Sequence, residues 1–289
     1  MKIIQLNNYD QIVKFINNAD YHTASYLYKL PQAHENVEVA IKQAIDDPGV
    51  FAQINEQDEI VMLIFAFKYE DNKYKVIGPF IDKNRELTTE SFKVLFETMA
   101  QSKPDTANFN FSFEEYEQNY SSFMKSIQSS YSFTDYHLIS TQDIGTVDNI
   151  QNITDYHPAY YRSFKKLHEH TFKHDVMTAD EIVNSLDKQH KLFVFMSEGL
   201  LKGYLYLQIY EDTKNAEIKY FSSHTDYRFM GIAFDLLSHA LNFAFSNYDI
   251  DKTYFKIRNK NHTLVERFNE LGFYINYEYK KFKYVAAHL

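Results

Sequence analysis

Apolar residues recur along the chain with two different periods, and the alternation between them predicts strands and helices in turn. In the second half, short apolar runs predict strands at 192–196, 204–209, 216–222, 253–257 and 274–284. Helical spacing predicts helices at 158–172, 178–186, 232–245 and 263–271. Thr178 is expected to cap the second helix together with Glu181, and Gly272 to end the last one. This order predicts an α/β (α+β) domain built around a mixed sheet.

The first half repeats nearly the same order of elements at an offset of about 142 to 145 positions. Its predicted strands are 2–6, 50–54, 61–67, 75–81, 108–113 and 133–139, and its predicted helices are 9–17, 37–45, 90–99 and 120–129. A polar stretch at 143–152 separates the halves. The sequence therefore predicts a duplication, with one domain at 1–145 and a second at 146–289, each with a mainly antiparallel sheet flanked by helices.

Composition supports two globular domains and excludes several kinds of chemistry. The 289 residues suit two domains of about 140 residues each. There is no cysteine, which excludes disulfides, thiolate zinc sites and a cysteine nucleophile. The N-terminus lacks a signal-like apolar segment, and no run approaches the ~20 apolar residues of a membrane span. We expect a cytoplasmic protein with no membrane partner, and the sequence leaves its oligomeric state open.

The formal net charge of −9 disfavours nucleic acid as a partner, because a polyanion would be repelled. The basic residues Lys280, Lys281 and Lys283 fall in a strand pattern, where we interpret them as a solvated face. The acidic balance mildly favours a cationic acceptor such as an amine.

The most informative segment runs from Ala216 to Ala233, where a strand leads through a loop ending Arg-x-x-Gly-x-Ala into an amphipathic helix. A turn of small residues at the start of a helix leaves backbone N–H groups unpaired, and the helix dipole adds partial positive charge there. Such a site suits a pyrophosphate. Gly231 and Ala233 allow close approach of the phosphates, and Arg228 keeps the loop positive.

This segment resembles the coenzyme A loop of the GNAT superfamily of N-acetyltransferases, which reads Arg/Gln-x-x-Gly-x-Gly/Ala. Three further matches lie at the expected places: Gly203-Tyr204 in the preceding strand, Asn261 seven residues before Phe268, and Leu271-Gly272-Phe273. The resemblance covers about residues 150 to 285, and it extends to the first half only through the order of elements. A strand, a glycine turn and a helix also occur in other α/β folds, but the four matches together favour this family.

The resemblance implies an acetyl-CoA-dependent N-acetyltransferase that acylates a primary amine by direct attack on the thioester. It places the pantetheine arm along the backbone of Phe221, Ser222 and Ser223. The pyrophosphate would lie on the amides of Phe229, Met230, Gly231, Ile232 and Ala233, beside Arg228. Asn261 matches a family position that commonly hydrogen-bonds the coenzyme. Phe229 and Met230 are bulkier than the residues usual in the family.

The resemblance also suggests catalytic residues, because the amine must lose a proton before it attacks. Glu217 lies on the strand where the histone-acetylating branch carries a general base; the alternative is a solvated strand glutamate. Phe268 stands where many relatives have a tyrosine that protonates the leaving thiolate, and phenylalanine has no proton to give. Tyr220 or Tyr274 are the substitutes to consider. Loss of turnover would leave an acyl-CoA-binding, sensor or structural module.

A metal site is the less favoured interpretation of the histidines near residue 170. His170 and His174 are spaced i, i+4, with His168 nearby, but the run lacks the His-Glu-x-x-His order and a third ligand. We therefore expect no metal, and we expect these residues to be solvated or to line an acceptor pocket.

The equivalent loop of the first half, 78–90, has no match to Arg-x-x-Gly-x-Ala, and Glu86 and Glu90 stand at its helix entrance. The first domain is therefore expected to be a degenerate, non-catalytic copy that covers the sheet or forms one wall of the acceptor site. The acceptor, a small amine or a peptide, is left open because acceptor specificity in the family depends on variable loops.

Overall fold

The computed structural model describes residues 2–21, 34–114, 120–141, 150–173, 176–224 and 231–286. The chain divides into two compact units. Unit 1 comprises Met1–Asp135 and Tyr277–Leu289, and unit 2 comprises Tyr136–Asn276. No helix within the described ranges is both long and apolar enough to cross a membrane.

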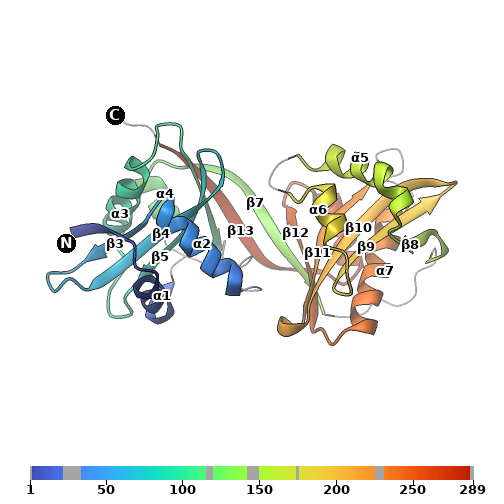
Figure 1. The fold of residues 1–289 in the computed structure, drawn as a ribbon, viewed down its shortest axis with the longest axis horizontal. Helices are drawn as coiled ribbons and strands as arrows, with labels where there is room; N and C mark the ends of the chain where they lie inside the picture. The colour runs from blue at the N-terminus through green and yellow to red at the C-terminus, as the bar shows by residue number, and fades with distance from the viewer. Residues whose placement is uncertain are drawn as a thin grey trace. The chain divides into compact units, whose positions relative to one another are not determined.

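Unit 1 is a mixed sheet in the order β1-β3-β4-β5-β6-β13, with helices on both faces (Figure 1). All its neighbouring strands are antiparallel except β5 and β6, which are parallel. Its elements are β1 (Lys2–Leu6), α1 (Tyr9–Asn18), β2 (Asp20–Tyr21), α2 (His34–Asp46), β3 (Val50–Ile54), β4 (Ile60–Glu70), β5 (Lys73–Ile81), α3 (Thr89–Gln101), β6 (Asn108–Glu114), α4 (Tyr120–Ser126) and the first part of β7 (Ser130–Ser140).

Unit 2 has the corresponding order β7-β12-β11-β10-β9-β8, in which β11 and β12 are parallel. Its elements are η2 (Ile150–Asn152), β8 (Ile153–Asp155), η3 (Pro158–Tyr160), α5 (Tyr161–Thr171), α6 (Ala179–Asn184), β9 (His190–Ser197), β10 (Leu200–Tyr210), η4 (Glu211–Thr213), β11 (Asn215–Ser223), α7 (Ile232–Asn247), β12 (Lys252–Arg258), α8 (His262–Glu270) and the start of β13 (Tyr274–Val285). The prediction of two tandem domains with mixed, mainly antiparallel sheets is confirmed.

The last strand of each half is shared between the units. Strand β7 passes from unit 1 to unit 2 at Asp135/Tyr136, and β13 passes back at Asn276/Tyr277. In unit 1, Tyr279–Val285 of β13 pairs antiparallel with β6. The predicted single boundary near residue 145 therefore differs from the observed division. Most of β13 belongs to unit 1, although the residues that precede it belong to unit 2, so one cut in the chain cannot separate the two units.

Two short strands, β2 and β8, were not predicted, because two and three residues are too few to show a period of two. Strand β8 pairs antiparallel with β9, as β1 pairs with β3. The predicted N-terminal cap of α6 and the predicted glycine that ends α8 are confirmed. Thr178 and Glu181 form a capping box, and Gly272 follows α8 with φ +78°.

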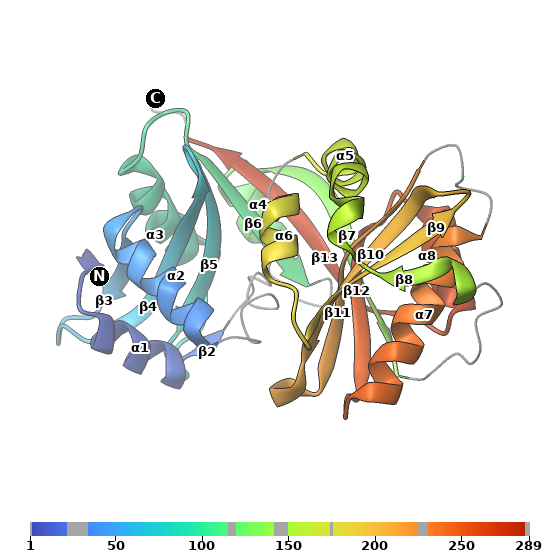
Figure 2. The same ribbon diagram turned by 45° about the vertical axis from the view of Figure 1, so that its right-hand side comes forward.

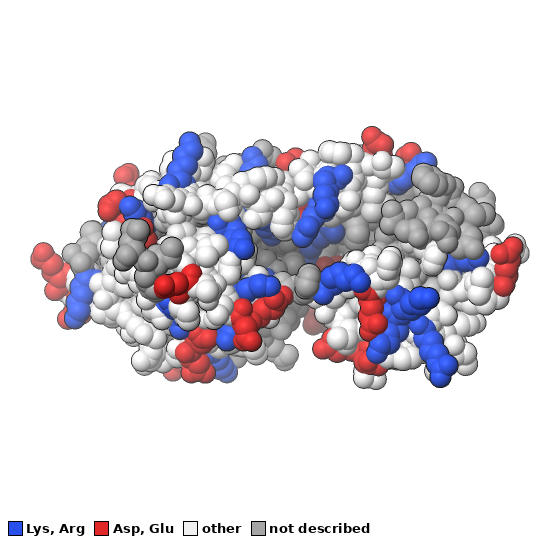
Figure 3. Space-filling view, turned by 90° about the horizontal axis from the view of Figure 1, so that it is seen from above, with Lys and Arg blue, Asp and Glu red and all other residues white. Residues whose placement is uncertain are grey.

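In unit 2, α5 and α6 lie on one face of the sheet and α7 and α8 on the other (Figure 2), and each face has its own hydrophobic core. Helices α5 and α6 bury Phe164, Leu167 and Ile182 against aromatic residues of β10 and β11. Helices α7 and α8 bury Leu236, Leu241 and Phe268 against the other face. Strand β10 is buried on both faces, which explains its nearly continuous apolar sequence. On the surface drawn in Figure 3, acidic and basic side chains are interspersed among uncharged ones.

Candidate functional site

Strands β11 and β12 separate partway along their length. They pair in parallel from Asn215/Lys252 to Ile218/Phe255. Beyond that point, within the described residues, β11 continues to Ser223 and β12 to Arg258 without pairing with each other. A strand whose edge is not paired presents N–H and C=O groups to an extended ligand. We call this opening the strand split.

A bulge in β11 begins at the split. The register with β10 shifts between Tyr206 and Leu207, so that Lys219 is the extra residue of β11. Past the bulge, Phe221, Ser222 and Ser223 still pair with β10 on one side. Their other edge therefore faces the split. A bulge bends its own strand, which is how two parallel strands can diverge without breaking the rest of the sheet.

Gly203 allows α7 to lie close to the sheet beside the split. A Cβ at this position would approach Ile232 Cγ2 to 3.0 Å, the Ser222 carbonyl oxygen to 3.1 Å and Leu236 Cδ1 to 3.2 Å. The glycine before Tyr204 is thus explained by packing: only a residue without a side chain lets the first turns of α7 contact β10 so closely.

Helix α7 begins at Gly231, the N-cap residue, which has φ +73°. Within the described residues no side chain caps this end, and a Cβ on Gly231 would meet open space. The first backbone N–H groups therefore have no side-chain acceptor there, as an anion site requires. Ile232 is buried and Ala233 half-buried. The predicted loop residues Arg228, Phe229 and Met230 lie outside the described residues.

Asn261 stands at the N-terminus of α8, just beyond the other strand of the split. It is the N-cap residue, yet its carboxamide makes no capping hydrogen bond, and the residue is exposed. An asparagine at an N-cap usually accepts from the helix amides. Its side chain is thus available to a ligand, as predicted for a coenzyme contact.

Glu217 lies in the paired part of β11, opposite Tyr254 of β12. It is only 5% exposed. Its Oε1 accepts from Lys256 Nζ at 2.9 Å, and its Oε2 accepts from Lys219 Nζ at 3.2 Å. The Tyr254 hydroxyl also donates to Oε2 at 3.4 Å, and the Tyr210 hydroxyl oxygen lies 3.3 Å from Oε2. We call Glu217, Lys219 and Lys256 the charged cluster.

The charges of the cluster shift the pKa values of Glu217 and of its neighbour His137. Burial alone would raise the pKa of Glu217, but the ammonium groups of Lys256 and then Lys219 outweigh it and lower that pKa to about 2. His137 of β7 lies with its ring 5.1 Å from that of Tyr254. Burial, and then the charge of Lys256, lower the pKa of His137 to about 4. At neutral pH the glutamate is ionised and the imidazole is uncharged.

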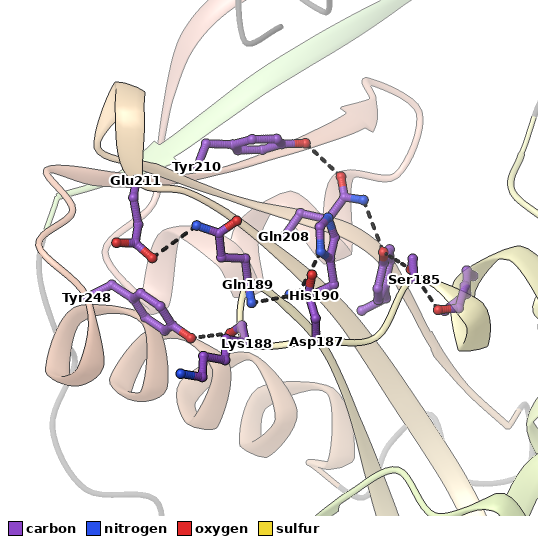
Figure 4. Close-up of polar contacts among 11 residues, drawn as sticks. Ser185, Asp187, Lys188, Gln189, His190, Gln208, Tyr210, Glu211 and Tyr248 are labelled. Carbon is purple, nitrogen blue, oxygen red and sulfur yellow. Dashed lines mark hydrogen bonds and ion pairs between the residues drawn. The ribbon is translucent and has the colours of Figure 1, made fainter.

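A row of hydrogen bonds runs from Tyr210 at the end of β10 to Ser185 (Figure 4). The Tyr210 hydroxyl donates to Gln208 Oε1 at 2.6 Å, and Gln208 Nε2 donates to the Tyr206 hydroxyl at 3.1 Å. That hydroxyl in turn shares a 2.7 Å hydrogen bond with Ser185 Oγ, just after α6. Burial, and then the Glu217 carboxylate, raise the pKa of Tyr210, so its hydroxyl stays protonated at neutral pH.

Phe268 is wholly buried and stacks on Phe255 with ring centroids 4.6 Å apart. It is a core residue under β12 and has no proton to donate. Of the two substitutes considered, Tyr220 is buried, and its hydroxyl accepts from the Met177 backbone N–H at 2.8 Å. Tyr274 is 49% exposed. The geometry of these residues singles out neither of them as an acid.

His168 is a structural residue of the core between α5 and the sheet. Its Nε2 lies 2.8 Å from the Met177 carbonyl oxygen, so this nitrogen carries the proton, and Nδ1 accepts from the Tyr204 hydroxyl at 2.6 Å. Burial lowers the pKa of His168, which agrees with a neutral ring. His170 is exposed, and His174 lies outside the described residues. The described ranges contain no group of three or more His, Cys, Asp or Glu side chains arranged to hold a metal.

Unit 1 has a corresponding split, but its own chain pairs along it. Strands β5 and β6 are parallel from Lys73/Asn108 to Lys75/Asn110. Further along β5, Phe80 and Ile81 pair with Tyr21 and Asp20 of β2. The strand edge that is open on β11 is therefore occupied on β5.

The helix entrance of unit 1 also differs. The Thr88 side chain caps α3 by accepting from the Ser91 N–H at 3.1 Å. Both first turns carry an acid, Glu90 in α3 and Asp235 in α7, so the difference between the two ends lies in the cap.

Sequence reasoning missed Lys219, Lys256, Tyr210, Tyr254 and His137. Their positions on adjacent strands alternate with core residues, which places them on the face of Glu217. The strand alternation was visible in the sequence. The register that brings four separate strands together, and the bulge at Lys219, were not.

The duplicated order of elements gives two tandem domains of one fold, and in unit 2 the sheet is split beside an uncapped helix N-terminus. Residues 152–273 match the model of the Acetyltransferase (GNAT) family, so unit 2 is a GNAT domain. The comparison with curated proteins found no match.

Solved structures show the same fold over both halves of the chain. A GCN5-related N-acetyltransferase from Sphaerobacter thermophilus aligns with TM-score 0.68 at 10% identity, over 99% of this chain and 96% of that one. A tandem GNAT protein from the clavulanic acid biosynthesis pathway aligns with TM-score 0.65 at 10% identity, over 100% and 99%. A GNAT-family acetyltransferase from Colwellia psychrerythraea aligns with TM-score 0.61 at 11% identity, over 98% and 100%.

Proposed function

We propose that unit 2 is an acetyl-CoA-dependent N-acetyltransferase for a primary amine. The observation that carries the proposal is the strand split beside an uncapped helix N-terminus. The split offers backbone groups to an extended arm, and the helix end offers N–H groups to a pyrophosphate. Both lie in the domain that matches an acetyltransferase family, which supports acyl transfer as the activity.

In this proposal the pantetheine arm pairs with the open edge of β11 at Phe221, Ser222 and Ser223. The pyrophosphate binds the amides from Phe229 to Ala233 with Arg228 nearby, and Asn261 hydrogen-bonds the coenzyme from α8. The thioester then lies near the start of the split, next to the charged cluster. Since the cosubstrate is an acyl-CoA, we place the reaction in the cytoplasm as part of the same proposal; no metal takes part in it.

The chemistry is a direct transfer. The neutral amine nitrogen attacks the thioester carbon, a C–N bond forms, and the C–S bond breaks. The nitrogen loses one proton, and the departing thiolate takes up one. With a thiol pKa of about 8.5, the sulfur can leave as thiolate without a strong acid, so Phe268 does not prevent turnover.

Glu217 fits a positioning residue better than a general base. A base is most effective when its pKa lies near the operating pH, and the pKa of Glu217 is held at about 2 by two ammonium groups. We therefore propose that Glu217 orients Lys219 and Lys256, and that the acceptor gives its proton to water.

The test is to titrate the full-length protein with acetyl-CoA by calorimetry and then to follow thiol release with a panel of amines, amino acids and peptides. We expect heat of binding, a rise in Tm with acetyl-CoA concentration, and thiol release with at least one acceptor. The absence of both heat and Tm shift at millimolar acetyl-CoA would refute the proposal.

A second candidate is an acyl-CoA-binding or sensor module without turnover. The burial of Phe268 in the core favours it, because the residue that supplies the acid in many relatives is here part of the hydrophobic packing. Binding of acetyl-CoA without thiol release across the whole panel would favour this candidate over the enzyme.

A further inference from the structure

Two lysines flank the start of the strand split. Ile218 and Phe255 are the last paired residues, so Lys219 and Lys256 are the first residues beyond the pairing on each strand. Both ammonium groups reach the same carboxylate, that of Glu217, at 3.2 and 2.9 Å. Their side chains therefore lie on the same face of the sheet.

The charged cluster is buried to different depths. The Glu217 side chain is 6% exposed, that of Lys256 is 15% exposed and that of Lys219 is 32% exposed. The cluster is thus closed on the side of Glu217 and opens toward solvent at Lys219. A ligand entering the split would meet the lysines before it met the carboxylate.

The cluster holds more positive than negative charge. One carboxylate faces two ammonium groups, and the neighbours Tyr210, Tyr254 and His137 are uncharged at neutral pH or contribute only hydroxyl donors. Lys219, Lys256 and Tyr254 already donate to the two oxygens of Glu217, and the Tyr210 hydroxyl lies 3.3 Å from Oε2, so the carboxylate is close to its capacity of about four acceptor sites. An ammonium carries three N–H groups, and within the described residues Lys219 is bonded to Glu217 alone.

A partly buried excess of one positive charge is stabilised by a second anion, because ionic interactions are stronger away from bulk water. We infer that Lys219 and Lys256 bind a carboxylate of the substrates, carried either by the acyl group of the thioester or by the amine acceptor. This inference rests on the proposed function, since it places the substrates in the strand split. It adds a carboxylate to the amine acceptor that the acidic net charge mildly favours, or to the acyl donor.

Matched pairs of ligands distinguish the two sources of the carboxylate. For the donor, butyryl-CoA and succinyl-CoA are compared by calorimetry, since the first ends in a methyl group where the second ends in a carboxylate. For the acceptor, the protein saturated with coenzyme A is titrated with amino acids and with the corresponding amino acid amides. We expect the carboxylate member to bind more tightly, by about ten- to a hundredfold, in one of the two arms.

Substitutions assign the preference to the cluster. Lys219→Met removes the more exposed lysine and leaves the Glu217–Lys256 pair, so it is the variant expected to fold normally; Lys256→Met is the second. Each substitution should lower the ratio of the affinity for the carboxylate ligand to the affinity for its neutral counterpart by about tenfold or more. This ratio is the readout, because a general change in affinity would affect both ligands alike. Lys219→Arg should keep the ratio. Lys166→Met, an exposed lysine on α5, is the matched control that removes a charge elsewhere.

The outcomes separate this inference from the proposed function. If neither acetyl-CoA nor coenzyme A binds, the proposed function fails and the inference fails with it. If acetyl-CoA binds but neither arm shows a preference for the carboxylate, only the inference is overturned. A preference that Lys219→Met and Lys256→Met leave unchanged would overturn it as well, because the carboxylate would then be bound by other groups.

Discussion

At the scale of single residues, the surroundings of Glu217 set its protonation state. A buried carboxylate without partners would have a raised pKa and would suit a base. Two lysines on neighbouring strand positions produce the opposite result and keep it ionised. These neighbours are the reason for proposing that Glu217 positions the lysines and does not act as a base.

The variant Glu217→Gln tests that role. A general base would show a rate loss of about 10² to 10⁴ that shrinks as pH rises and more acceptor is neutral. We expect instead a loss that is the same at all pH values, because the ionised carboxylate only holds the lysines in place. The measurement is kcat against pH, with coenzyme affinity followed separately. Recovery of the rate at high pH would return Glu217 to the role of base.

Glu217 should also contribute to acid sensitivity. Folding lowers the pKa of Glu217 from 4.5 to about 2. The ionised carboxylate therefore stabilises the fold at pH values above 4.5, and this stabilisation is lost as the pH falls toward 2. A shift of this size corresponds to about 3 kcal/mol. The difference in free energy of unfolding between the native protein and Glu217→Gln should therefore narrow between about pH 5 and pH 2. A constant difference in urea titrations over that range would contradict the ion pairing.

At the scale of elements, the site depends on how α7 and β11 meet β10. Gly203 lets α7 approach the sheet, the bulge at Lys219 bends β11, and Gly231 begins the helix with a positive φ. None of these three features carries chemistry of its own. Together they let β11 separate from β12 and place the uncapped N-terminus of α7 beside the split.

Gly203→Ala should disturb both stability and ligand binding. The new Cβ would lie 3.1 Å from the Ser222 carbonyl oxygen, so backbone must move, and overpacking of this kind costs about 1–3 kcal/mol. We expect a lower Tm together with weaker acetyl-CoA binding. Gly199→Ala, in the β9–β10 turn with φ +72° and open space around it, is the control that introduces strain away from α7. Gly199→Ala should lower Tm without weakening acetyl-CoA binding. If it weakens binding as much as Gly203→Ala does, the loss of binding comes from general destabilisation and not from the contact between α7 and β10.

At the scale of the whole molecule, two copies of one fold have different strand edges. In unit 2 the edge of β11 is open in the split, whereas in unit 1 β2 pairs along β5 and Thr88 caps α3. These differences support the prediction that the first half is a degenerate copy.

If only unit 2 binds coenzyme A, calorimetry should give one coenzyme A per chain. Two sites per chain would refute the prediction that unit 1 is degenerate.

The paired variants Gly231→Glu and Arg85→Glu locate that single site. The first places bulk and negative charge where phosphates would approach the α7 amides, and binding should be lost. The second alters an exposed loop residue of unit 1, and binding should persist. Gly231→Ala is the control for backbone strain, since any side chain at positive φ costs about 1 kcal/mol. Equal losses from Gly231→Glu and Arg85→Glu would mean that unit 1 also holds coenzyme.

The sequence by itself determined the helices, nearly all the strands, the duplication and the glycine that begins α7, because these follow from short-range periodicity, capping and the special conformations of glycine. Thr178, Gly203, Gly231 and Gly272 were identified in this way. Only the tertiary structure decided that Glu217 meets Lys219 and Lys256, that β7 and β13 are shared between the units, and that β2 pairs along β5. These features depend on strand register and on which edges meet across many residues, and the alternation of apolar and polar positions is the same for every register that keeps the same face buried.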